Sequence, residues 1–302
     1  MYESALEILN ILNNKGFAAY IVGGYPRDVY LGIEGTDIDI CTSAFPKDVF
    51  SLFDAVDMLY ASYGVVRLTY QGFLYEITTF RRDKSLRNGN RSYRIEYVNT
   101  LEEDLARRDF VMNTLCMNRF GEFVDYMNAR KDIEARIIRS VKDPLVSFSE
   151  DPLRMLRAIR FATCLSFDVS DDVKTAIMSK KALLTKLSFF HRKNELHLIF
   201  SNKNIIKGVS YIKDLHLDSF LCIDVSSIVY CSNPLGIWAQ CIYDERYPFT
   251  KQERKTIQDI RFVLSLPSSF ALLHQYGTFI CNIVDEIRGS KEYFELQKDF
   301  LS

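Results

Sequence analysis

Two neighbouring stretches decide the fold: Ile21-Val22-Gly23-Gly24-Tyr25-Pro26-Arg27-Asp28 and Thr36-Asp37-Ile38-Asp39-Ile40. The second has the alternation of a β-strand, which predicts that Asp37 and Asp39 point the same way, roughly 7 Å apart. Two carboxylates held in this way suit hard divalent cations, which prefer oxygen ligands. Next to them, the pair Gly23 and Gly24 would let backbone N–H groups approach a phosphate closely. Together these features predict phosphoryl or nucleotidyl transfer.

The composition sets broad limits on the class of protein. The chain has 302 residues, of which 48% are hydrophobic and 25% charged, and its formal net charge is −1. This length allows about two domains. Apolar runs are short and the N-terminus lacks a basic start with an apolar core, so we expect neither a membrane span nor a signal peptide. A nucleic-acid partner would need locally clustered basic residues, because the net charge is near zero.

Cysteine usage points to a reducing compartment. The seven cysteines are scattered, odd in number and without any C-x-x-C pair. This pattern favours reduced thiols in the cytoplasm and argues against a zinc site.

Hydrophobic spacing predicts a mixed α/β head followed by helices. The expected elements of the head are a helix over 4–16, a strand over 18–22, a short helix from Pro26, a strand over 37–39, a hairpin of 65–70 and 73–80, a mobile loop over 81–94, and further elements within 101–117 and 133–141. Beyond about Asp143, the segments 154–165, 173–179 and 183–200 have apolar periodicity without hairpin signals. We therefore expect an α+β fold in which a mixed-sheet head precedes an all-helical remainder.

The Asp-x-Asp pair has a bland alternative, since such pairs near strand ends are often merely solvated. Ile38 and Ile40 indicate that the opposite face of the strand is buried, so the acidic face is exposed or lines a cleft. A similar alternation over 74–77 would bring Glu76 beside the aspartates as a third candidate carboxylate, although a lone glutamate on a strand is usually a solvated residue.

A second group of charged residues spans 101–110. Its plain interpretation is a helix start with acidic residues in the first turn and basic residues after them. In a functional interpretation, Arg108 offers a planar fork for a triphosphate, and Asp109 orients it or an adjacent arginine.

A third group lies at 149–160, where Ser149 before an acidic pair and Pro152 predicts a helix start. Its charged residues recur at every third position and form a slowly drifting row on one helix: Asp151, Arg154, Arg157 and Arg160. Three arginines in a row repel one another, which indicates an anionic partner such as a triphosphate or an RNA backbone.

Asp151 and Arg154 have the chemistry to select two bases. Cytosine and adenine both present an amine donor beside a ring-nitrogen acceptor. A carboxylate and a guanidinium satisfy either base. Guanine and uracil present the reverse order and would leave buried groups unpaired.

These motifs, in this order and spacing, resemble those of class II tRNA nucleotidyltransferases, the CCA-adding enzymes and bacterial poly(A) polymerases. The residues that carry the resemblance are Gly23-Gly24-x-x-Arg27-Asp28, Asp37-x-Asp39, Arg107-Arg108-Asp109 and Glu150-Asp151-x-x-Arg154. The similarity covers about residues 15–200.

The resemblance implies a DNA polymerase beta-like catalytic head over 1–142, a helical neck with base recognition over 143–200, and an RNA-binding helical body with a short tail over 201–302. It implies Mg²⁺ on Asp37 and Asp39, and triphosphate contacts from Gly24 and Arg27. Arg108 would hold nucleotide in the head, and Asp151, Arg154, Arg157 and Arg160 would bind it in the neck. ATP and CTP would be substrates and tRNA the acceptor.

Three positions depart from the family pattern. Asn88 and Asn90 stand where an aspartate and an arginine are usual, in a loop of full family length that favours CCA or A addition. His191 stands where the family usually has an arginine in the later neck, and the plain alternative is an ordinary surface residue.

Trp238, Tyr243, Tyr247 and Phe249 are candidates for stacking on RNA, although aromatic residues at such spacing are more often core. The short tail predicts a reduced contact with the tRNA elbow.

The leading hypothesis is template-independent addition of C and A to the 3′ end of tRNA, with release of pyrophosphate. Alternatives within the same chemistry are CC-only addition, A-only addition and poly(A) synthesis. A different class is a non-catalytic RNA-binding protein, against which the intact aspartate pair argues. The oligomeric state is left open.

Overall fold

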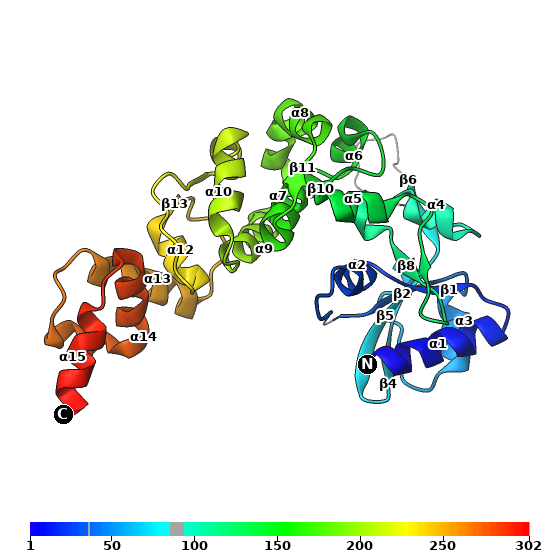
Figure 1. The fold of residues 1–302 in the computed structure, drawn as a ribbon, viewed down its shortest axis with the longest axis horizontal. Coiled ribbons are helices and arrows are strands. Elements are labelled where there is room, and N and C mark those ends of the chain that lie inside the picture. The colour runs from blue at the N-terminus through cyan, green and yellow to red at the C-terminus, as the bar shows by residue number, and fades with distance from the viewer. Residues whose placement is uncertain (36, 85–93, 302) are drawn as a thin grey trace. The chain divides into compact units, whose positions relative to one another are not determined.

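The computed structural model describes residues 1–35, 37–84 and 94–301, and the chain forms two compact units, Met1–Glu150 and Asp151–Ser302 (Figure 1). Asn88 and Asn90 lie outside the described residues. The helices of the first unit are α1 (Tyr2–Asn14), α2 (Gly24–Tyr30), α3 (Pro46–Leu52), α4 (Leu101–Leu105), α5 (Ala129–Ala135) and α6 (Pro144–Glu150), with 3₁₀ turns η1 (Ala61–Tyr63) and η2 (Val111–Asn113). Its strands are β1 (Ala19–Val22), β2 (Asp39–Thr42), β3 (Val56–Asp57), β4 (Val65–Tyr70), β5 (Phe73–Thr79), β6 (Arg81–Lys84), β7 (Arg94–Tyr97), β8 (Cys116–Met117), β9 (Phe123–Val124) and β10 (Ile137–Ile138).

A mixed seven-stranded sheet forms the centre of the first unit, in the order β3-β4-β5-β2-β1-β8-β9. The pairing of β2 with β5 is parallel, whereas the other pairings in this sheet are antiparallel. This confirms the predicted mixed sheet and the predicted hairpin of β4 and β5. The predicted loop over 81–94 was wrong at its ends, because β6 and β7 pair antiparallel there.

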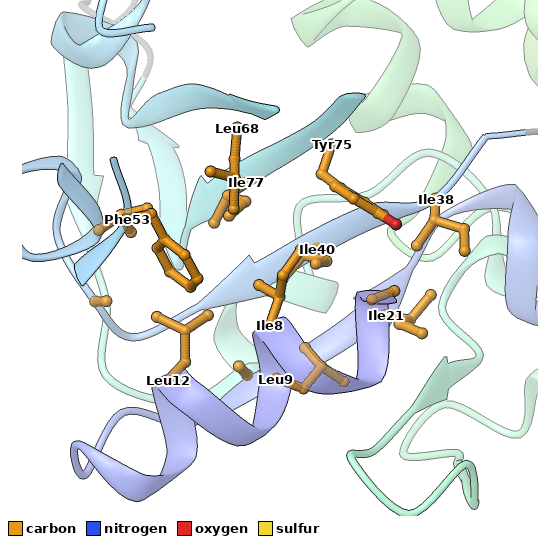
Figure 2. Close-up of a cluster of buried hydrophobic side chains, with 14 of the residues drawn as sticks. Ile8, Leu9, Leu12, Ile21, Ile38, Ile40, Phe53, Leu68, Tyr75 and Ile77 are labelled. Carbon is orange, nitrogen blue, oxygen red and sulfur yellow. The ribbon is translucent and has the colours of Figure 1, made fainter. Parts of the chain in front are cut away.

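The helix α1 packs on one face of the sheet and forms the main core of the unit. Ile8, Leu9 and Leu12 of this helix are fully buried against side chains of the strands, among them Ile40 and Ile77 (Figure 2). Each such aliphatic side chain contributes about 1.5–3 kcal/mol of burial free energy. Tyr75 lies in the same core, and its hydroxyl is 2.6 Å from that of Ser4 in α1.

A second cluster covers the opposite face of the sheet, where Val22, Cys41 and Cys116 meet Leu101 and Leu105 of α4. Since side chains alternate along a strand, Asp39 lies on this face with Cys41, while Ile40 faces α1. The carboxylate-bearing face is therefore the one that α4 and the residues after it approach.

The second unit is mainly helical. Its helices are α7 (Leu153–Leu165), α8 (Asp171–Lys180), η3 (Lys181–Lys186), α9 (Phe189–Phe200), α10 (Ile205–Asp214), α11 (Asp218–Leu221), α12 (Pro234–Gln240), α13 (Lys251–Leu264), α14 (Phe270–Arg288) and α15 (Glu292–Leu301). The expectation of an all-helical remainder was wrong in one detail, because β11 (Asp168–Val169), β12 (Ile223–Asp224) and β13 (Ile242–Tyr243) are short strands, and β12 pairs with β13. The division into a neck over 143–200 and a body over 201–302 stays a prediction.

The aromatic residues considered for RNA stacking form the core of the second unit. Trp238 and Tyr247 are fully buried and Phe249 is nearly so. The Trp238 ring is 5.0 Å from Phe249 and 5.5 Å from Tyr243 in edge-to-face arrangements. The plain alternative, a packed core, is the correct one here.

Candidate nucleotidyl-transfer site

The two predicted metal ligands lie at the start of β2. Asp39 is the first residue of this strand, and its direct partner in the parallel neighbour β5 is Glu76. Asp37 precedes the strand, so the prediction that both aspartates occupy one strand was wrong. The reason is that β1 ends at Val22, opposite Asp39, and the chain then turns at Gly23 and gives residues 37 and 38 no partner on that side.

The predicted burial pattern around the acids is confirmed. Ile38 and Ile40 are buried, whereas Asp37, Asp39 and Glu76 are exposed. The structure therefore places Asp39 and Glu76 on the accessible face of the neighbouring inner strands β2 and β5, with Asp37 just before β2 and the hydrophobic core behind them.

Asp39 has an unusual electrostatic environment. Desolvation by the surrounding protein is the main cause of a raised pKa for this carboxyl group. The negative charges of Glu76 and Asp37 raise the pKa further, and the guanidinium of Arg108 opposes them. Mutual repulsion among carboxylates is what a bound cation relieves.

Gly23 gives the turn after β1 its close approach to Asp39. It has φ +82°, a conformation that costs little only for glycine, and a Cβ built there would lie 3.0 Å from Asp39 Oδ2. Any side chain at this position would occupy the space next to the carboxylate. The backbone of the glycine turn therefore forms one wall of the site.

Arg27 is folded back over the start of α2 and almost wholly buried. Its Nε and Nη2 donate to Asp28 Oδ1 at 2.9 and 2.7 Å, and its Nη1 donates to Asn113 Oδ1 at 2.6 Å. A Cβ at Gly24 would lie 3.3 Å from Arg27 Nη2, so the second glycine leaves room for the guanidinium.

Arg108 is held by a buried acid that the sequence analysis did not single out. Asp104 is fully buried, and it accepts hydrogen bonds from Arg108 Nη2 at 3.2 Å, Arg107 Nε at 2.9 Å and the backbone N–H of Arg81 at 3.1 Å. Burial acts to lower the pKa of Arg108, but attraction to Asp104 outweighs it and the pKa is raised. The i, i+3 and i, i+4 spacing of this acid before two arginines was the signal that could have found it.

Two thiols lie on the same face of the sheet. Burial raises the pKa of Cys116 to about 12 and also raises the pKa of Cys41. Both remain neutral at physiological pH, so neither is an activated nucleophile. All seven cysteines are free, as predicted.

The second unit carries the predicted row of charged residues on α7. Asp151 precedes this helix, and its Oδ1 accepts the N–H of Leu153 at 3.0 Å, while its Oδ2 lies 3.9 Å from Arg154 Nε. The predicted helix start at Ser149 was wrong. Ser149 lies in the last turn of α6 and donates to the carbonyl of Leu145. The helix α6 ends before Pro152, because a proline cannot continue it.

Arg160 has an anionic partner within the protein. Its Nε lies 3.0 Å from Oε2 of Glu195 in α9, and its guanidinium stacks 4.4 Å from the Phe161 ring centre. The inference that all three arginines need an external anion was therefore wrong for this one. His191 is exposed on the same helix α9, with its Nδ1 3.1 Å from Ser188 Oγ, which agrees with the surface interpretation.

This fold, with an acidic sheet face beside a glycine turn and anchored arginines, defines a nucleotidyltransferase head joined to a helical unit. A family model described as the poly A polymerase head domain matches residues 19–139. The CCA-adding enzyme of Geobacillus thermodenitrificans is 36% identical over 220 residues, 73% of this chain and 54% of that enzyme. The CCA-adding enzyme of Lactobacillus helveticus is 40% identical over 188 residues, 62% of this chain and 47% of that enzyme.

Solved structures of CCA-adding enzymes have the same fold. The Bacillus stearothermophilus CCA-adding enzyme in complex with CTP superimposes with a TM-score of 0.86 at 26% identity, covering 99% of this chain and 82% of that chain. The Thermotoga maritima CCA-adding enzyme complexed with tRNA has a TM-score of 0.69 at 21% identity, covering 98% and 81%, and shows the fold alone. The chain belongs to the class II tRNA nucleotidyltransferase family. It spans about half the length of the curated relatives that it matches.

Proposed function

We propose that this chain adds C and A nucleotides to the 3′ end of tRNA from CTP and ATP, without a template and with release of pyrophosphate. The observation that carries the proposal is the packing of the Gly23 turn against Asp39, directly beside Glu76. Neighbouring acids with the backbone of a glycine turn beside them suit a triphosphate and its counter-ion. The named relatives act as CCA-adding enzymes, and one of them was solved with CTP.

Asp37 and Asp39 would hold Mg²⁺. The donor set fits, because it consists of carboxylate oxygens, and desolvation followed by repulsion from Glu76 and Asp37 raises the pKa of Asp39. Among the described residues, no three or more His, Cys, Asp or Glu side chains gather closely enough to enclose a metal. Two carboxylates leave the other positions for water and substrate phosphate, as Mg²⁺ sites commonly do. Glu76 would act mainly through its charge.

The arginines of the head would bind the triphosphate. Arg108, anchored by Asp104 and electrostatically coupled to Asp39, is suited to hold the phosphate groups near the acids. Arg27 and the backbone of Gly24 would contact the triphosphate from the glycine turn.

The second unit would read the base. Asp151 and Arg154 already lie side by side, which supports a carboxylate acceptor next to a guanidinium donor. That order matches cytosine and adenine and leaves guanine and uracil unsatisfied. Arg157 would add a further positive charge for the nucleotide, whereas Arg160 is paired with Glu195.

The reaction needs no protein nucleophile. The tRNA 3′-hydroxyl attacks the α-phosphorus in line, the bond to the bridging oxygen breaks, and pyrophosphate leaves. Arg108 and Arg27 would stabilise the charge that develops on the leaving group. When bound, Mg²⁺ supplies Lewis-acid chemistry that activates the hydroxyl and neutralises phosphate charge. The acids of β2 and β5 orient these partners on a rigid sheet face.

The proposal also places the chain in the cytoplasm, where tRNA is processed, and the free thiols support this placement. In the part of the chain that the structure describes, no helix has the length and apolar character to cross a bilayer.

A direct test uses three acceptors with single nucleotides: tRNA lacking the terminal CCA, tRNA ending in CC, and an unrelated RNA. We expect CTP to extend the first tRNA by two residues and ATP to extend the second by one, with little UTP or GTP incorporation. Action on one tRNA only would assign CC-only or A-only addition, and equal extension of the unrelated RNA with ATP would assign poly(A) synthesis. RNA binding without incorporation would identify a non-catalytic binding protein.

A further inference from the structure

We propose that Asn113 is a positioning residue for Arg27, the arginine that contacts the triphosphate in the function proposed above, on which this inference rests. Asn113 ends the 3₁₀ turn η2, far along the sequence from the glycine turn. It follows an apolar stretch, Phe110-Val111-Met112, in which an amide side chain has no packing advantage. A buried amide in such a place needs partners, and the structure provides two.

The contacts form a directed chain of hydrogen bonds. Asn113 Oδ1 accepts from Arg27 Nη1 at 2.6 Å, and Asn113 Nδ2 donates to Asp109 Oδ1 at 3.2 Å. The same Asp109 oxygen accepts the backbone N–H of Phe110 at 2.8 Å. Asp109 therefore fixes which end of the amide faces Arg27, and the amide fixes one edge of the guanidinium.

The other edge of the guanidinium is fixed by Asp28, which accepts from both Nε and Nη2. Arg27 and Asn113 are each 6% exposed, and Asp109 is 9% exposed. A planar fork held at two edges in a buried setting has little rotational freedom, so its remaining surface is presented in a fixed direction.

The choice of an amide at this position has an electrostatic reason. Asp28 already offsets the positive charge of Arg27 through a direct ion pair. With Asp109 keeping its charge, a carboxylate at position 113 would set three negative charges against one guanidinium and repel a triphosphate. A neutral acceptor orients Arg27 without cancelling its charge. Residues 104–113 would thus orient both Arg108 and Arg27. Asp104 anchors Arg108, and Asp109 acts on Arg27 through Asn113.

The test compares the full chain with Asn113→Ala, Asn113→Asp and the exchange variant Asp109→Asn/Asn113→Asp. The exchange keeps the net charge and leaves an acceptor facing Arg27, while the hydrogen bond between positions 109 and 113 is kept with its direction reversed. A matched control is Asn118→Ala, which removes a surface asparagine that bonds Glu122 in the turn between β8 and β9.

We expect Asn113→Ala to raise KM for CTP and for ATP alike by about tenfold, with a smaller change in kcat and none in KM for tRNA. Asn113→Asp should weaken both nucleotides at least as much. The exchange variant should recover most of the affinity, and Asn118→Ala should match wild type. Thermal unfolding identifies variants that are simply destabilised.

An unchanged KM for nucleotides in Asn113→Ala would overturn the proposal, as would an equal rise in KM for tRNA or an exchange variant no better than Asn113→Asp. Calorimetric titration with CTP and with pyrophosphate gives the same ranking without turnover. If wild type binds CTP but incorporates nothing, the proposed function fails while the positioning role is still decided by the binding series.

Discussion

Asp39 on β2 and Glu76 on β5 are direct partners in a parallel strand pairing, so their carboxylates leave the sheet side by side. The charge of Glu76 raises the pKa of Asp39, after desolvation the largest such contribution. This face of β2 and β5 therefore gathers like charges that proteins ordinarily keep apart. In the function proposed above, a bound cation would offset this negative charge.

Removing either predicted metal ligand should abolish catalysis. We expect Asp37→Asn and Asp39→Asn to slow nucleotide incorporation by about 10³-fold or more, since several kcal/mol of transition-state stabilisation are lost. Binding of tRNA, followed by gel shift, should stay within about threefold. Asp54→Asn, at an exposed acid elsewhere in the head, is the control. Near-normal turnover in Asp37→Asn and Asp39→Asn would refute the metal assignment.

Gly23→Ala should separate backbone strain from its effect on the site. The change places a methyl group 3.0 Å from Asp39 Oδ2 and imposes φ +82° on alanine. Gly16→Ala is the matched control, because Gly16 has φ +88° with open space around it. Both variants should lose about 1–2 kcal/mol in urea unfolding. Only Gly23→Ala should lose activity, and similar activity in both would argue against a role for this turn.

Asp151→Asn should relax the choice of base. The asparagine keeps an acceptor for the N–H of Leu153, but it adds a donor where cytosine and adenine present their amine. We expect the preference for CTP over UTP, measured as the ratio of kcat/KM, to fall by at least about tenfold. Asp171→Asn, at an exposed acid in the first turn of α8, should leave the ratio unchanged. A ratio preserved in Asp151→Asn would contradict the base-reading role.

Glu195→Gln should destabilise the second unit. Glu195 pairs with Arg160 at 3.0 Å, and both side chains are mostly buried. Removing the carboxylate charge breaks the 3.0 Å ion pair in a mostly buried setting, which costs about 3 kcal/mol in the free energy of unfolding. Asp171→Asn breaks the exposed pair with Lys174 and should cost less than about 0.5 kcal/mol. Equal losses of unfolding free energy in the two variants would show that burial of the Arg160–Glu195 pair does not increase its contribution to stability.

His197 should make stability depend on pH. Burial lowers its pKa below the ordinary 6.5, and Lys193 lowers it further while Glu253 opposes. The unfolded chain therefore binds a proton more readily, so this share of stability is complete above about pH 6.5 and is lost as pH falls towards the folded pKa. The drop in unfolding free energy from pH 7.5 to 5.5 should be smaller in His197→Gln, and unchanged in His274→Gln at an exposed histidine of α14. Identical drops in all three proteins would exclude His197.

Local sequence patterns predicted much of the head. Alternation over 74–77 and the apolar neighbours of Asp39 correctly predicted which face of each strand is buried. The extent of β2 was not predictable in this way, because it depends on where β1 stops, which is set by pairing and not by the residues of β2. The error at Ser149 was local, because Pro152 cannot continue a helix and Ser149 therefore lies at the end of α6.

Partners distant in sequence were the main omission. Arg160 belonged to a quoted motif, yet only the packing of α7 against α9 shows that it pairs with Glu195. Asn113 was passed over because a single amide has no distinctive periodicity, whereas the spacing of Asp104 before Arg107 and Arg108 was a local signal. Such residues are defined by the donor that reaches them through space.

The parallel pairing of β2 with β5 also has a consequence for folding kinetics. The hairpin of β4 and β5 joins neighbouring segments and closes a short loop. Pairing of β2 with β5 closes a much longer loop, so its entropic cost is larger and it forms more slowly. Docking then brings Asp39 against Glu76 and adds like-charge repulsion to the loop-closure cost. We therefore expect the acidic face of β2 and β5 to assemble late in refolding, and millimolar Mg²⁺ to speed that last step.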